Sequence, residues 1–164
     1  IVFAKIINKQ IYIIDFYENT GHDIGHYIEI INSKNYKYAG HFMPHDAKKR
    51  NNTVGVNILD FCRTEYNFRA EPIPKTNSVR DDIEIVRRNL PDILIDEKVD
   101  TLIDHLKNYQ WNPTTGKILH NEHSHAADAV RMMFMAYHHG MIKEYLIKSD
   151  KPVMQYVTDD WMIL

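Results

Sequence analysis

The chain has 164 residues, a length that fits one domain, and its 44% hydrophobic and 26% charged residues exclude an intrinsically disordered protein. A net charge of −2 excludes the global basic field that recruits nucleic acid unaided, so any contact with nucleic acid must be local. The apolar runs fall short of the roughly 20 residues that cross a bilayer, and a single cysteine, Cys62, excludes an internal disulfide.

The chain opens with a predicted β-hairpin and a helix. Residues 1–7 and 11–17 are rich in Ile, Val, Phe and Tyr and flank the polar turn "NKQ", which is typical of two paired strands. Residues 20–34 then place apolar side chains at helical spacing, and Thr20 is the predicted N-cap.

The next segments predict a third strand, a helix and a short strand. The third strand covers residues 36–43 and is followed by a loop that begins at Asp46. A helix is expected over residues 53–65, and the proline-bounded stretch 68–74 predicts a short strand.

Two amphipathic helices follow, separated by a short extended stretch. Ser78, with an acidic residue three positions later, is the predicted N-cap of a helix over residues 78–90. Residues 92–97 are expected to be extended, and residues 98–109 repeat the apolar spacing of a helix.

A long helix is predicted to close the folded region, with Ser124 as its N-cap and Gly140 at its end. Alternating strands and helices favour an α/β fold with a mixed sheet flanked by helices. We therefore expect one domain over residues 1–140 and a C-terminal tail over residues 141–164.

Two stretches combine a carboxylate with neighbouring histidines, "PHDA" around Asp46 and "HNEHSHAADA" at the start of the long helix. On that helix His125 and Asp128 are three residues apart, so both side chains project from one face. Oxygen ligands of this kind suit Mg²⁺ or Mn²⁺. From spacing alone, however, a capping or buried Asp is the commoner explanation for each carboxylate.

Other charged and histidine-rich stretches allow two interpretations. The cations Lys48, Lys49 and Arg50 normally form a solvated surface, but beside a metal site they could contact a DNA phosphate. His22 and His26 have the i, i+4 spacing of zinc ligands, and His120, His123 and His125 also cluster in sequence. "HDIGH" lacks the Glu of a metalloprotease motif, so hydrogen-bonded or surface histidines are favoured.

Taken together, the motifs resemble the C-terminal nuclease domain of phage terminase large subunits, the DNA-packaging motors of tailed phages. The resemblance covers residues 1–136, and its features occur in the order "IYIIDFYENTG", "HY", "PHDA", "PIPKTNSVRDDIEIVRRNLP", "YQWNP" and "HSHAADAVRM".

The resemblance implies a ribonuclease H-like fold whose acidic cluster binds two Mg²⁺ or Mn²⁺ ions and cuts concatemeric double-stranded DNA. It assigns Asp46 and Asp128 as catalytic metal ligands and places His125 near the metals, while Arg131 falls in a matching position with a structural role. It also implies, as partners, the terminase ATPase domain, the small terminase subunit and the portal, in the cytoplasm of a host bacterium.

The family's first catalytic Asp lies on its first strand in a "D-x-G" context, which falls before Ile1. The resemblance therefore implies a nuclease domain shortened at its N-terminus, lacking the first strand, and Asp15 on the second strand is expected to be structural. Two alternatives remain: a catalytically incomplete remnant or docking module of the same fold, and another ribonuclease H-like nuclease such as a resolvase.

Overall fold

The predicted hairpin forms the centre of the sheet in the computed structural model, which describes residues 1–51, 55–142 and 162–163. β1 (Val2–Ile7) and β2 (Gln10–Phe16) pair in antiparallel fashion. Between them, Asn8 and Lys9 have φ values of 50° and 67°. Two consecutive left-handed residues give the turn whose twist matches that of paired strands, so the hairpin prediction is confirmed.

Three further strands complete a five-stranded sheet in the order β3-β7-β1-β2-β6. β6 (Ile93–Ile95) lies parallel to β2 on one side of the hairpin. On the other side, β7 (Met162–Ile163) is antiparallel to β1 and parallel to β3 (Tyr38–Gly40). The sheet is therefore mixed and the fold is α/β, as expected.

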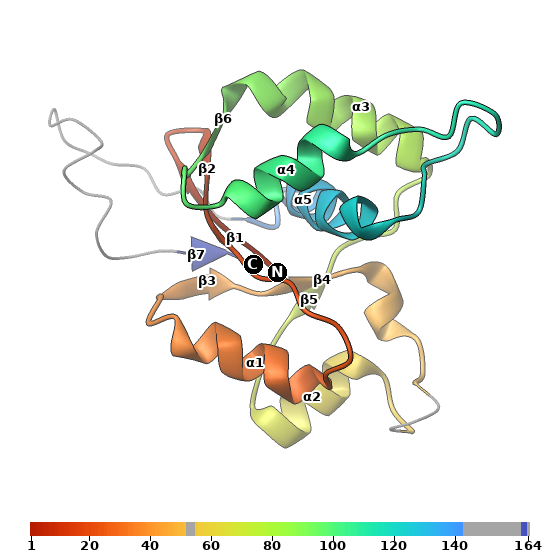
Figure 1. Cartoon of the computed structure of the whole chain (residues 1–164). Coiled ribbons are helices and arrows are strands. Elements are labelled where there is room, and N and C mark those ends of the chain that lie inside the picture. Colours follow the sequence, from red (N-terminus) through yellow and green to blue (C-terminus); the bar gives the residue numbers. More distant parts are fainter. Residues whose placement is uncertain (52–54, 143–161, 164) are drawn as a thin grey trace, which may run out of the picture.

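Helices cover both faces of this sheet (Figure 1). One face carries α3 (Val79–Asn89), α4 (Asp100–Asn108) and α5 (Glu122–His138). The opposite face carries α1 (Ile24–Ser33) and α2 (Ile58–Tyr66). Among the residues that the structure describes, no helix has the length and apolar character of a membrane span.

β1 separates two hydrophobic cores because successive side chains of a strand point to opposite faces. Val2, Ala4 and Ile6 pack with α4 and α5 in one core, in which Phe134 is also buried. Phe3 points the other way and packs with residues of α1 and α2 in the second core. The sheet thus joins two helical layers, and every residue of β1 is buried.

The third strand predicted over residues 36–43 is wrong as a single element. The chain leaves the main sheet after β3, and β4 (Phe42–Met43) pairs instead with β5 (Glu71–Pro72) in a separate two-stranded sheet. The backbone N–H of Glu71 donates to His41 O (2.7 Å), which fixes this second pairing. Local sequence does not encode the change, because the pairing partner lies about thirty residues further along the chain.

The segment after β4 forms a helical turn where the sequence predicted a loop. Asp46 lies in a single 3-10 helical turn, η1 (His45–Lys48), which starts directly after Pro44. A second such turn, η2 (Leu90–Asp92), follows α3 and leads into β6. Pro44 has no N–H to donate, which suits the residue before a new helical turn.

One predicted N-cap is confirmed and two are wrong. The Ser78 hydroxyl accepts the backbone N–H of Asp81 (3.2 Å) at the start of α3. Asp23, rather than Thr20, caps α1, because its carboxylate accepts the backbone N–H at the first turn of that helix. His22 therefore precedes α1, and the i, i+4 helical spacing proposed for it does not apply.

The long helix begins earlier than predicted. Asn121 caps α5, and Ser124 occupies the third helical position of a reciprocal capping box, in which its hydroxyl accepts the Asn121 N–H (3.3 Å). Gly140, with φ of 67°, follows the helix end as predicted. Of the predicted tail over residues 141–164, residues 143–161 and 164 lie outside the described residues, as do residues 53 and 54 of the predicted second helix.

Candidate functional site

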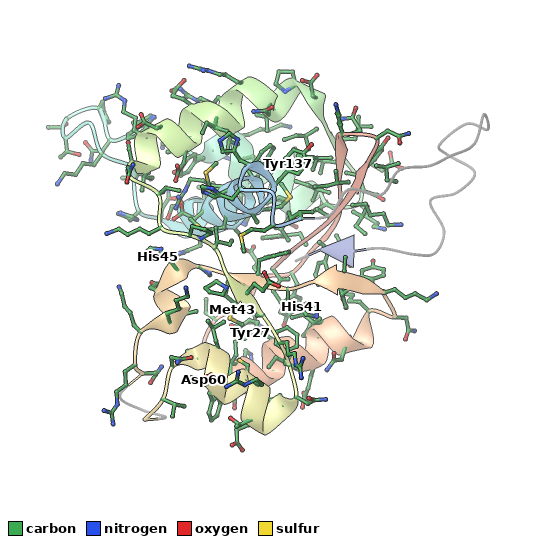
Figure 2. All side chains as sticks on the ribbon, turned by 180° about the vertical axis from the view of Figure 1, so that it is seen from behind. Tyr27, His41, Met43, His45, Asp60 and Tyr137 are labelled. Carbon is green, nitrogen blue, oxygen red and sulfur yellow. The ribbon has the colours of Figure 1, made fainter. Side chains whose placement is uncertain are left out.

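A pocket of about 460 Å³ lies beside the first residues of β1 and is lined by both α1 and α5. Its lining comes from α1, from the segment between β3 and η1, and from the first turns of α5. Figure 2 labels Tyr27 from α1 and His41, Met43 and His45 from the chain that crosses between the layers. Apolar side chains make up most of the wall, and the polar groups are few.

The three residues predicted to be catalytic all line this one pocket. Asp46 comes from η1 and is exposed, whereas His125 and Asp128 come from one face of α5, as their spacing predicted. Asp46 and Asp128 are separated by about eighty residues of chain, so only the tertiary fold brings them to a common cavity.

Asp128 is held by an arginine on its own helix. Arg131 Nε and Nη2 each lie 3.1 Å from Asp128 Oδ1, and Arg131 Nη1 lies 2.9 Å from Asp82 Oδ2 on α3. The side chains of Arg131 and Asp82 are only 11% and 5% exposed, so the guanidinium joins two carboxylates in a largely buried setting. Asp82 was not recognised from the sequence.

The donor set suits a hydrated Mg²⁺ or Mn²⁺ ion, which proteins often hold through one or two carboxylates together with waters. Asp46 and Asp128 provide those two carboxylates at the pocket wall. Within residues 1–51, 55–142 and 162–163, no three or more His, Cys, Asp or Glu side chains are grouped so that they could jointly hold a metal ion. Asp46 and Asp128 are therefore the pocket carboxylates that could hold such an ion.

The predicted phosphate-binding cations divide between two environments. Lys48 lines an open cleft of about 830 Å³, where Arg63 and Arg69 also lie. Lys49 is exposed at the end of η1, and Arg50 donates from Nε to Gly55 O (3.0 Å). Lys48 is thus the predicted cation that the structure places in a cleft adjoining the pocket.

His41 lines both cavities and was missed by the sequence analysis. Its ring lies between Tyr38 and Phe68, with centroid distances of 4.8 and 4.3 Å. Its Nδ1 atom is buried and has no hydrogen-bond partner within the described part of the chain. Burial lowers the pKa of His41 to about 4, so the ring is neutral at pH 7.

We expect His41→Phe to make the free energy of unfolding less dependent on pH below pH 6.5. The pKa of His41 is lower in the folded chain than in the unfolded chain, so the unfolded chain binds more protons between pH 6.5 and 4. Wild-type stability therefore falls as pH drops through this window. Urea unfolding measures the fall in the free energy of unfolding between pH 7.5 and pH 4.5. We expect this fall to be about 2 kcal/mol smaller in the variant than in the wild type, allowing for partial exposure of the ring.

The unfolding free energy at pH 7.5 serves as the internal control for this substitution. Phe can contact the rings of Tyr38 and Phe68 in the same place, and it removes an unpaired buried nitrogen, so we expect a change of less than about 1 kcal/mol. Equal pH slopes for the wild type and His41→Phe would contradict the assignment of acid sensitivity to His41.

The remaining histidines do not converge as the zinc interpretation required. The rings of His22 and His26 stack at 4.0 Å, while His26 Nε2 lies 2.7 Å from the Tyr17 hydroxyl. Stacked rings present their faces to each other, so their nitrogens do not point to a shared ion. His120 is exposed, and His123 is not among the residues that line the pocket.

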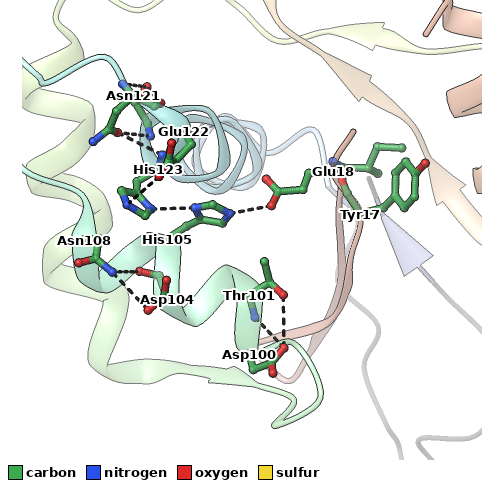
Figure 3. Close-up of polar contacts among 12 residues, drawn as sticks. Tyr17, Glu18, Asp100, Thr101, Asp104, His105, Asn108, Asn121, Glu122 and His123 are labelled. Carbon is green, nitrogen blue, oxygen red and sulfur yellow. Dashed lines mark hydrogen bonds and ion pairs between the residues drawn. The ribbon is translucent and has the colours of Figure 1, made fainter. Parts of the chain in front are cut away.

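His123 belongs to a separate polar chain (Figure 3). His105 on α4 lies with Nδ1 2.9 Å from His123 Nδ1 and with Nε2 2.7 Å from Glu18 Oε1, just after β2. This chain links three elements that are distant in sequence. Asp15, the other early carboxylate, pairs with Lys34 (2.8 Å) and is not part of the pocket wall, in agreement with a structural role.

Comparison of the chain with models of known families, with curated proteins and with solved structures finds no match.

Proposed function

We propose that this chain is a divalent-metal-dependent DNA endonuclease domain of ribonuclease H-like type, similar to the nuclease domain of phage terminase large subunits. One observation carries the proposal: Asp46, His125 and Asp128, selected from sequence motifs eighty residues apart, line the same pocket. The mixed sheet with helices on both faces is compatible with that fold class.

In the proposed site, Asp46 and Asp128 hold the divalent ions, two by the family resemblance. Bound Mg²⁺ or Mn²⁺ supplies charge stabilisation and activation of water for phosphodiester hydrolysis. His125 is exposed at the rim, where its imidazole can exchange a proton with the reacting groups. Lys48, Lys49 and Arg50 would hold the DNA backbone through phosphate contacts.

The biological setting is part of the same proposal. The substrate is concatemeric double-stranded DNA in the cytoplasm of a host bacterium. The terminase ATPase domain, the small subunit and the portal are the partners that the resemblance implies. Cutting would occur at the start and at the end of packaging.

Plasmid nicking tests the proposal directly. Supercoiled plasmid is incubated with the chain and Mn²⁺ or Mg²⁺, alongside reactions with EDTA. A form extended upstream of Ile1 is assayed in parallel, because the resemblance expects the first catalytic Asp there. We expect nicked and linear products in the Mn²⁺ reaction of at least the extended form, and none with EDTA.

The other outcomes separate the competing functions. DNA binding by both forms without cleavage would favour a docking module over a nuclease. Strong preference for branched over linear DNA would favour a resolvase-like nuclease. The proposal would be contradicted if both forms failed to bind DNA and failed to cleave it.

A further inference from the structure

Arg131 occupies the wall between two cavities. It lines the 460 Å³ pocket together with Asp128, and it also lines a smaller cavity of about 140 Å³ between α3, α4 and α5. Its guanidinium reaches from α5 to Asp82 on α3 (2.9 Å). The Thr76 hydroxyl, just before α3, donates to the same Asp82 oxygen (2.7 Å). Asp82 is therefore anchored from two sides.

Burial of this ion pair is not explained by stability alone. Removing two charges from water costs several kcal/mol per ion, and apolar replacements of buried pairs are often neutral or stabilising. The chain offers a direct contrast, because Asp60 and Arg63 on α2 form an i, i+3 pair at 2.7 Å with both side chains about half exposed. Of these two pairs, the Asp128–Arg131 pair is the one extended by a buried second carboxylate, Asp82.

The contact geometry leaves one oxygen of Asp128 available. Arg131 Nε and Nη2 both lie 3.1 Å from Oδ1, so both guanidinium nitrogens contact the same carboxylate oxygen. Asp128 Oδ2 has no hydrogen bond or ion pair with any residue that the structure describes. The Asp128 side chain is 39% exposed and lines the larger pocket.

We propose that Asp82 and Arg131 are positioning residues that fix the Asp128 carboxylate so that Oδ2 is directed to a divalent ion. This proposal rests on the proposed metal-dependent nuclease function. Partners outside the ligand shell commonly set ligand orientation, and their loss weakens metal affinity by about tenfold to a hundredfold. Asp82 acts here through Arg131, without contact with Asp128.

Direct Mn²⁺ binding to the chain tests this role without DNA and without catalysis. Titration calorimetry compares the wild type with Arg131→Lys, which keeps the charge but removes the two guanidinium nitrogens, and with Asp82→Asn. We expect the dissociation constant for Mn²⁺ to rise by about tenfold in both variants. Thr76→Val is milder and should raise it about threefold, so one variant remains informative if Asp82→Asn does not fold.

Arg63→Lys on α2 is the matched control, because it alters an exposed pair with the same spacing and should leave Mn²⁺ affinity unchanged. If folded Arg131→Lys and Thr76→Val bind Mn²⁺ as tightly as the wild type, the positioning role is overturned while the metal site stands. If neither the wild-type chain nor the form extended upstream of Ile1 binds Mn²⁺, the proposed function fails and the positioning role fails with it.

Discussion

Asp46→Asn and Asp128→Asn should each lower the rate of Mn²⁺-dependent plasmid nicking by at least about a hundredfold. Each substitution keeps the side-chain shape and removes the negative charge that would hold a divalent ion at the pocket wall. A bound metal contributes several kcal/mol to the stabilisation of charge in the transition state, and each 1.36 kcal/mol corresponds to a tenfold change in rate. Initial rates at saturating DNA provide the measurement, in whichever form of the chain is active.

The appropriate control is Asp92→Asn, because Asp92 is exposed in η2 and is not part of the pocket. It should leave the nicking rate within about twofold of the wild type, as expected for a substitution away from the reacting groups. Wild-type rates in both Asp46→Asn and Asp128→Asn would remove these residues from the catalytic site. Loss of activity with Asp128→Asn alone would limit the assignment to α5.

Arg131→Met should destabilise the fold by about 3–5 kcal/mol. The substitution preserves much of the side-chain length but leaves Asp82, 5% exposed, as a buried carboxylate without its cation. Urea unfolding at pH 7.5, followed by circular dichroism, measures the loss. The same change at Arg63 should cost less than about 1 kcal/mol, because that ion pair is exposed to solvent.

A double variant separates the penalty of an unpaired charge from the loss of packing. Asp82→Val combined with Arg131→Met removes both charges, and apolar pairs at such positions are often as stable as the ion pair they replace. We expect the double variant to recover most of the stability lost in Arg131→Met. No recovery would show that the methionine fails to pack between α3 and α5, and would contradict the unpaired-charge explanation.

The elements that the sequence predicts well are those with a local cause. The hairpin follows from two β-branched runs on either side of a short polar turn, and α3 follows from the Ser78 cap and its apolar spacing. The division of the predicted third strand into β3 and β4 has no local cause in the sequence. β3 and β4 differ in their pairing partners, β7 and β5, which lie elsewhere in the chain.

The candidate site also combines features that follow from local sequence with features that depend on tertiary packing. The common face of His125 and Asp128 follows from helical geometry, but their place in one pocket with Asp46 depends on how α5 and the η1 segment pack. Asp82 did carry a signal, because it lies four residues before Val86 and so falls on the apolar side of α3. His41 carried none, since its burial depends on Tyr38 and Phe68 folding around it.

The polar chain of Figure 3 has a consequence for the hydrogen atoms of two imidazoles. Two Nδ1 atoms 2.9 Å apart accommodate one hydrogen between them. When His105 is neutral, its hydrogen lies on Nε2 and is donated to Glu18, so its Nδ1 is the acceptor and His123 must carry its own hydrogen on Nδ1. In that neutral state, a carboxylate at the end of β2 selects the tautomer of a ring on α5 that it does not touch.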